Sequence, residues 1–127
     1  MTPQAALLIM SSLIFKHFIF DFPISMQTPW MFLNKGKYGH PGGLAHAGLH
    51  IVGTFLVIPW ALVFYKPFMI TSMLIFEFLV HYHMDWFKVW YGTRKKWTPQ
   101  TPQFWTFLGI DQMVHYFTYI IMVWWLI

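Results

Sequence analysis

The sequence contains no cysteine and few charged residues. Of its 127 residues, 9% are charged and only four are acidic. Without cysteine there can be no disulfide bond or thiolate metal site, so a metal would need nitrogen and oxygen donors. A soluble domain usually carries about 25% charged residues. The shortage of charge therefore argues against an ordinary soluble domain.

Hydrophobic and aromatic residues are abundant instead. They make up 57% and 22% of the chain, and mean hydropathy is positive. This composition predicts a membrane protein, with the lipid bilayer as its partner. At about 20 residues per crossing, four helices and their loops nearly fill the chain. We therefore expect one membrane domain, residues 1–127. No expected helix has a basic face, so we expect no nucleic-acid partner.

Four apolar segments define the expected fold, an all-α polytopic membrane protein. We predict an antiparallel bundle of four transmembrane helices at about residues 3–22, 43–65, 68–90 and 102–127. Pro23 is expected to end the first helix. That segment has no positively charged start and no small-residue cleavage site, so we expect it to be retained rather than removed as a signal peptide.

The positive residues predict an orientation. Loops 23–42 and 91–101 lie on the same side of a four-crossing bundle and hold most of the positive charge. The positive-inside rule places these loops in the cytoplasm and both termini on the opposite side. We therefore expect the bacterial inner (cytoplasmic) membrane, or a host membrane if the protein is phage-encoded. The residues that decide this are Lys35, Lys37, Arg94, Lys95 and Lys96, against Lys66 on the other side.

Every acidic residue lies four positions from a histidine. On a helix this spacing places both side chains on one face. Seven histidines in the chain make such a coincidence an event on the order of one in ten thousand. Isolated carboxylates in apolar surroundings are costly unless they are paired, protonated or bound to metal. The motifs are His17 with Asp21, His81 with Glu77 and Asp85, His115 with Asp111, and the acid-free pair His46 with His50.

The four motifs predict a metal site. In the expected topology they share one layer of the bundle, in its cytoplasmic half. So many donors suit two divalent ions better than one tetrahedral ion, with zinc expected first and iron or manganese as alternatives. The candidate ligands are His17, Asp21, His46, His50, Glu77, His81, Asp85, Asp111 and His115. Glu77 and Asp111 are also the candidate catalytic bases, and Lys35, Lys88 and Gln112 the candidate substrate-binding residues.

Plainer interpretations remain open. Each His–Asp pair could join helices by a hydrogen bond, or the set could form a proton relay. Lys16 is expected to extend its amine toward the membrane surface. His40 is expected on the surface, and His83 is expected to have a structural role because it points to a different helix face from His81.

The ordered motifs resemble a known family. His17-x-x-x-Asp21, His46-x-x-x-His50, Glu77-x-x-x-His81-x-x-x-Asp85 and Asp111-Gln112-x-x-His115 together resemble the domain of unknown function 3307 family of small bacterial and phage membrane proteins. The resemblance covers nearly the whole chain. It departs at Gln27, which follows the Asp21-Phe22 pair less closely than in the family pattern. The motifs are also similar to those of inner-membrane proteins described as candidate metal-dependent hydrolases.

From these features we expect a membrane-embedded, dinuclear metal-dependent hydrolase whose substrate is a lipid phosphoester. The site would lie near the depth of lipid headgroups, and the lysines could bind a phosphate. One alternative is a non-haem di-iron lipid oxidase or hydroxylase, although the chain lacks adjacent His-His pairs. The other is a non-enzymatic metal-binding membrane protein, either a transporter or a phage-type effector.

Overall fold

The computed structural model describes all 127 residues apart from the side chain of Leu62. The fold is all-helical, and no strand occurs within the described chain. The helices are α1 (Pro3–Ile19), the π-helical turn η1 (Phe20–Ile24), α2 (Pro29–Phe32), α3 (Pro41–Val57), α4 (Ala61–Phe64), α5 (Pro67–Arg94) and α6 (Pro102–Trp125).

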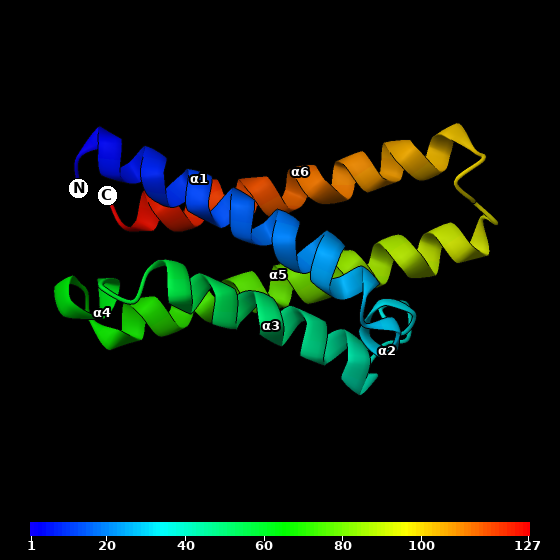
Figure 1. Cartoon of the computed structure of the whole chain (residues 1–127), viewed down its shortest axis with the longest axis horizontal. Helices are drawn as coiled ribbons and strands as arrows, with labels where there is room; N and C mark the ends of the chain where they lie inside the picture. The colour runs from blue at the N-terminus through cyan, green and yellow to red at the C-terminus, as the bar shows by residue number, and fades with distance from the viewer.

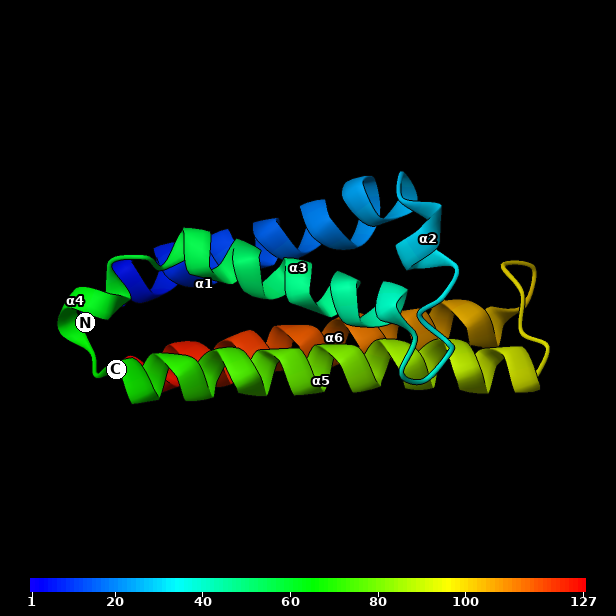
Figure 2. The same cartoon turned by 90° about the horizontal axis from the view of Figure 1, so that it is seen from below.

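The four long helices form a bundle of two layers. Helices α1 and α3 make one layer and α5 and α6 the other (Figure 2). Helix α1 packs against α3 and α6, and α5 packs against the same two neighbours. Both termini and α4 lie at one end of the bundle, while α2 and the α5–α6 connection lie toward the other (Figure 1).

Prolines determine where most helices begin. Each of α1, α2, α3, α5 and α6 starts with a proline at one of its first positions. A proline is favoured there because the amide hydrogen that it lacks would have no partner within the helix. The side chain of His40 caps α3 by accepting a hydrogen bond from Gly42 N at 3.0 Å. His40, expected as a plain surface histidine, therefore has a local structural role.

Two of the expected helix boundaries are wrong, and a proline accounts for each. The first helix does not end before Pro23, because a π-helical turn accommodates this proline and carries the chain to Ile24. The helix expected at 43–65 does not run through to Tyr65. It ends at Val57, and Ile58 then leaves the helical region with φ −122° and ψ 39°. A residue before proline is disfavoured in the α region, and Pro59 follows.

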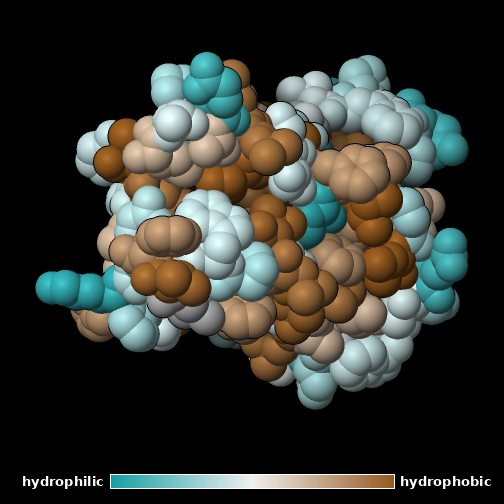
Figure 3. All heavy atoms as spheres, turned by 60° about the vertical axis from the view of Figure 1, so that its left-hand side comes forward, coloured by the Kyte–Doolittle hydropathy of each residue, from teal (hydrophilic) through white to brown (hydrophobic). Residues whose placement is uncertain are grey.

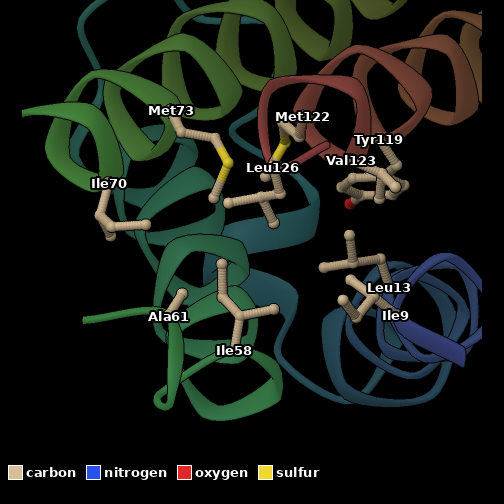
Figure 4. Packing of buried hydrophobic residues seen from close by; sticks show 10 residues of the cluster. All are labelled: Ile9, Leu13, Ile58, Ala61, Ile70, Met73, Tyr119, Met122, Val123 and Leu126. Carbon is tan, nitrogen blue, oxygen red and sulfur yellow. The ribbon is translucent and has the colours of Figure 1, made fainter. Parts of the chain in front are cut away.

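The interior of the bundle has an apolar half and a polar half. The apolar half draws its residues from the segments near both termini, from α4 and from the start of α5, and Figure 4 shows them packed together. Its buried residues are Ile9, Leu13, Ile58, Ala61, Ile70, Met73, Tyr119, Met122, Val123 and Leu126. Farther along the bundle, the interior is filled by lysine, histidine and carboxylate side chains. Tyr119 lies at the boundary, with its ring in the apolar cluster and its hydroxyl directed to polar groups.

One segment of the described chain is long and apolar enough to cross a membrane. It is Pro3–Ile24, whose best window has a mean hydropathy of 1.6. Core helices of soluble proteins and signal sequences meet the same criterion. Helix α3 is apolar but has only 17 residues. The buried polar residues of α5 and α6 reduce the hydropathy of these longer helices. The lengths and hydropathies of the helices therefore do not support the four membrane crossings expected from the sequence.

Candidate metal centre

The nine residues predicted as ligands lie together inside the bundle. Helix α1 with η1 contributes His17 and Asp21, α3 contributes two histidines, and α5 and α6 contribute the rest. All nine are buried, with exposed fractions of 6% or less. We call this set the ligand cluster; it comprises His17, Asp21, His46, His50, Glu77, His81, Asp85, Asp111 and His115.

Four members of the ligand cluster form one potential metal site. Asp21, His46, His50 and His81 each offer a donor atom, and these atoms lie within 4.8 Å of one another. His46 Nε2 lies 3.2 Å from Asp21 Oδ1 and 3.1 Å from His81 Nε2. A tetrahedral ion with bonds of about 2.1 Å holds its ligands roughly 3.5 Å apart. Small inward shifts of these side chains would therefore allow them to bind an ion.

A second potential site shares His81 with the first. His81, Asp85 and His115 also offer donor atoms within 4.8 Å of one another. The ring centroids of His81 and His115 are 4.2 Å apart, and those of His81 and His50 are 3.8 Å apart. The imidazole of His81 thus lies between the two groups of donors. Each group could hold a metal ion, and the groups are adjacent. Two ions at the same time would require His81 to bridge them as an imidazolate that binds through both ring nitrogens.

Several donor atoms in the ligand cluster have no hydrogen-bond partner within the described structure. A buried polar atom without a partner is costly, so such atoms indicate a missing ion, water or ligand. The unpartnered atoms fit a metal because they are ring nitrogens and carboxylate oxygens, the donors that zinc, iron and manganese accept. They are His46 Nδ1, His50 Nδ1 and Nε2, His81 Nδ1 and Glu77 Oε2. Asp85 Oδ2, Asp111 Oδ1 and His115 Nε2 also make no hydrogen bond, but each lies within 3.3 Å of a nitrogen or oxygen of a neighbouring charged or imidazole group.

Two lysines form ion pairs with three of the four carboxylates of the ligand cluster. Lys35 Nζ lies 3.0 Å from both Asp21 Oδ1 and Asp85 Oδ2. Lys88 Nζ lies 3.1 Å from Asp85 Oδ1 and 2.6 Å from Asp111 Oδ2. Three carboxylates are thus linked by two ammonium groups. A divalent ion at either site would compete with these lysines for the same oxygens.

Gln112 connects α6 to α1 at the edge of the ligand cluster. Its amide nitrogen donates to Asp21 Oδ2 at 2.9 Å and to Asp111 Oδ2 at 3.2 Å. Its amide oxygen lies 3.2 Å from His17 Nε2. Gln112, Lys35 and Lys88, predicted to bind substrate, therefore all contact carboxylates of the ligand cluster directly.

Glu77 lies apart from the two potential metal sites. Its Oε1 accepts a hydrogen bond of 2.6 Å from Lys16 Nζ. The same amine donates to Tyr119 Oη and to the backbone oxygen of His50, both at 3.1 Å. Tyr119 Oη in turn lies 3.1 Å from His17 Nδ1. Lys16 is buried in this network, so the prediction that its amine extends toward the membrane surface is wrong.

The sequence interpretation missed Lys16 and Tyr119. Tyr119 lies four residues after His115, so the spacing that identified the other motifs places it on the same helix face. Lys16 had a weaker signal. It lies eight residues before the end of η1, which is deeper inside the helical segment than a snorkelling lysine normally reaches. The outward direction assumed for its side chain was the error.

The remaining histidine of α5 lies outside the ligand cluster. His83 is exposed, with Nε2 at 3.1 Å from the hydroxyl of Tyr38 and Nδ1 at 2.7 Å from the backbone oxygen of Leu79. The two-residue offset from His81 turns its ring to another face of the helix. His83 therefore provides a matched control for substitutions in the ligand cluster.

The fold and the site define an all-helical bundle with a buried histidine–carboxylate core. A family model described as protein of unknown function (DUF3307) matches residues 9–127, and the chain belongs to this family. No curated protein and no solved structure matches the chain.

Proposed function

We propose that the protein is a membrane-embedded, metal-dependent hydrolase that binds two divalent ions and acts on a lipid phosphoester. The observation that carries the proposal is the pair of adjacent donor groups that share His81. Two ions in adjacent sites are a recurring arrangement in enzymes that cleave phosphate esters. Zinc is the ion we favour, because the donors are mainly imidazole nitrogens with a few carboxylate oxygens.

The outer surface of the bundle supports a membrane location. Large apolar side chains face outward on every long helix, and the chain has few charged residues to cover them. Hydrophobic residues occupy much of the face shown in Figure 3. Examples are Leu8 on α1, Leu56 on α3, Phe68 on α5 and Trp124 on α6, each at least 69% exposed. Exposure on this scale is costly in water and favourable in lipid.

The chain offers a base beside the second donor group. Each of the two carboxylates expected to act as bases has one oxygen paired with a lysine, Glu77 Oε1 with Lys16 and Asp111 Oδ2 with Lys88, both at 2.6 Å. Asp111 is the better placed of the two, because its Oδ1 lies 3.3 Å from Nε2 of His115 in the second donor group, whereas Glu77 lies apart from both groups. Asp111 can therefore accept a proton from a nucleophilic water. When bound, divalent ions would supply the Lewis acid that activates this water.

Lys35, Lys88 and Gln112 support the choice of a phosphoester. Their nitrogen atoms converge on the carboxylates beside the two donor groups. If divalent ions bind these carboxylates, the nitrogens of Lys35, Lys88 and Gln112 lose their present partners and can bind the oxygens of a phosphate. Ammonium and amide groups of this kind hold phosphate oxygens in many sites.

A non-enzymatic metal-binding protein is the second candidate function. The observation in its favour is that Lys35 and Lys88 already form ion pairs with Asp21, Asp85 and Asp111. A buried ion-pair network of this kind can hold helices together without catalysis. The two candidate functions predict different results for one measurement, because only the hydrolase releases phosphate or headgroup from lipid phosphoesters.

The test combines metal analysis with lipid hydrolysis. The detergent-purified protein is expected to contain a transition metal and, after reconstitution, to release phosphate or headgroup from lipid phosphoesters. His81→Ala should lose both properties, and Asp85→Ala should lose the release and about half of the metal, because Asp85 belongs to one donor group only. The control His83→Ala should keep both properties. Release that is absent across substrates, or unchanged in the first two variants, would exclude the hydrolase. Retained metal without release would favour the non-enzymatic candidate.

A further inference from the structure

A cavity of about 520 Å³ opens beside the ligand cluster. It lies between the η1–α2 region, the last turns of α5 and the first turns of α6, at the bundle end away from the termini (Figure 1). Ligand pockets typically enclose about 300–1,000 Å³. The cavity is therefore large enough for a small molecule or for one lipid chain.

The walls of the cavity are apolar. They include Phe22 from η1, Val89 from α5, and Phe104, Phe107 and Leu108 from α6. Aromatic and aliphatic walls of this kind bind a hydrocarbon chain by excluding water from both surfaces. A sugar or a nucleotide would lose hydrogen bonds to water against these walls and gain few in return.

The inner end of the cavity is charged. Asp21, Lys35 and Lys88 line it, and these residues also belong to the ion-pair network of the ligand cluster. Together with Asp85 and Asp111, the network contains three carboxylates and two ammonium groups, a formal charge of about −1. Two divalent ions would reverse this charge to about +3. A buried excess of positive charge requires an anion close by.

We infer that this cavity binds a single-chain anionic amphiphile, with its phosphate-like head at Lys35 and Lys88 and its hydrocarbon chain against Phe22, Phe104 and Phe107. The inference deepens the proposed function and relies on it for the ions that release the two lysines. It adds the position of the substrate, whose head lies beside the donor groups and whose chain points toward the open end of the cavity.

A non-hydrolysable probe separates binding from catalysis. Dodecylphosphonate has a phosphate-like head, a twelve-carbon chain and a carbon–phosphorus bond that a phosphoesterase does not cleave. Its affinity for the zinc-loaded protein in a neutral detergent can be measured by calorimetry. Dodecanol tests the chain alone, and methylphosphonate tests the head alone. We expect dodecylphosphonate to bind at least about tenfold more tightly than either of them, because neither uses both ends of the cavity.

Two pairs of variants locate the probe. Leu108→Trp fills the apolar part and should weaken dodecylphosphonate binding at least about tenfold while leaving methylphosphonate unchanged. Ile110→Trp is its control, because Ile110 is exposed on α6 outside the cavity lining. Lys88→Gln should weaken both phosphonates but not dodecanol. Its control is Lys66→Gln, since Lys66 lies at the other end of the bundle.

The results distinguish the cavity assignment from the proposed hydrolase function. Tight binding of dodecylphosphonate that Leu108→Trp and Lys88→Gln weaken would support the cavity assignment even if no lipid is hydrolysed. Equal affinity for dodecylphosphonate and methylphosphonate would overturn it, as would an unchanged affinity in Leu108→Trp. If lipid hydrolysis occurs but dodecylphosphonate does not bind, the proposed function stands and the cavity assignment fails.

Discussion

Lys16 and Glu77 form a buried ion pair at the junction of the apolar and polar halves of the bundle. The amine and the carboxylate oxygen are 2.6 Å apart, and both side chains are almost fully buried. The pair joins α1 to α5, two helices of the bundle that do not pack directly against each other. Desolvation makes such a pair only weakly stabilising as a whole, but removal of one partner leaves an unpaired buried charge.

The ion pair predicts that a double substitution costs less stability than either single substitution. Lys16→Met or Glu77→Gln alone should lower the free energy of unfolding, by about 3–5 kcal/mol for the lysine variant. The double variant Lys16→Met with Glu77→Leu should recover most of this loss. Thermal unfolding in detergent measures the effect. Glu77→Gln should also leave the metal content unchanged, and loss of metal in this variant would instead make Glu77 a ligand.

The shared position of His81 predicts an unequal effect of histidine substitutions on metal content. His81→Ala should reduce the bound metal from about two equivalents to well below one, because both donor groups use this residue. His46→Ala and His115→Ala each disrupt one group and should leave about one equivalent. Elemental analysis of purified protein measures this, with His83→Ala as the control. Equal loss in all three variants would contradict two separable sites.

Removal of metal should destabilise the bundle. A ligand that binds only the folded state stabilises it according to its concentration and affinity. We therefore expect a chelator to lower the melting temperature of the native protein and zinc to restore it. His81→Ala should start from a lower melting temperature and respond to neither addition. A melting temperature unaffected by chelator in the native protein would indicate that Lys35 and Lys88 alone stabilise the carboxylates.

Local sequence patterns were sufficient to place the long helices and the members of the ligand cluster. Apolar runs and prolines are signals within a few residues of the boundaries that they set, and the four-residue spacing fixes a helix face wherever a helix forms. This is why His81 and Asp85 could be assigned to one face before the fold was known. The break at Ile58 follows a local rule that the sequence interpretation did not apply, because Ile58 precedes Pro59. The π-helical turn at Pro23 lay beyond such rules, because a proline normally ends a helix.

Contacts between distant segments could not be read from these patterns. Lys35 is buried because the loop before α3 folds back and places its amine between Asp21 and Asp85, which belong to different helices. Lys16 is buried because its amine meets Glu77, which is 61 positions away in the chain. Charge pairing across the bundle thus required three-dimensional information, whereas donor spacing along one helix did not.

The contact between α1 and α3 leaves no room for a side chain at Gly53. A Cβ atom at this position would clash with the ring of Phe20 and lie 2.8 Å from Lys16 Cδ. Gly53→Ala should therefore lower the free energy of unfolding by about 1–3 kcal/mol, because the side chains of Phe20 and Lys16 must move away from the added methyl group. Gly48→Ala is the matched control on the same helix, since a Cβ there would meet nothing within 4 Å. The control should be neutral or stabilise by up to about 1 kcal/mol.

Thermal unfolding of the two alanine variants compares them directly. A larger loss in Gly48→Ala than in Gly53→Ala would contradict the close approach of α1 to α3. An increase in stability for Gly53→Ala would do the same, because the general preference of alanine for helices would then outweigh any clash.

The proposed membrane topology predicts which side of the bilayer each loop faces. The α5–α6 connection, which includes Lys95, and the α4–α5 connection, which includes Lys66, lie at opposite ends of the bundle (Figure 1). For the four crossings expected from the sequence, the positive-inside rule predicts that Lys95 lies in the cytoplasm. The chain has no cysteine, so Lys95→Cys and Lys66→Cys would each carry a unique thiol.

In intact spheroplasts, a membrane-impermeant maleimide should label Lys66→Cys at once and Lys95→Cys only after the membrane is permeabilised. The cysteine-free native protein measures background labelling. Labelling of Lys95→Cys alone in intact spheroplasts would reverse the orientation. Labelling of both variants in intact spheroplasts, or of neither variant until the membrane is permeabilised, would show that α5 does not cross the membrane between these two connections.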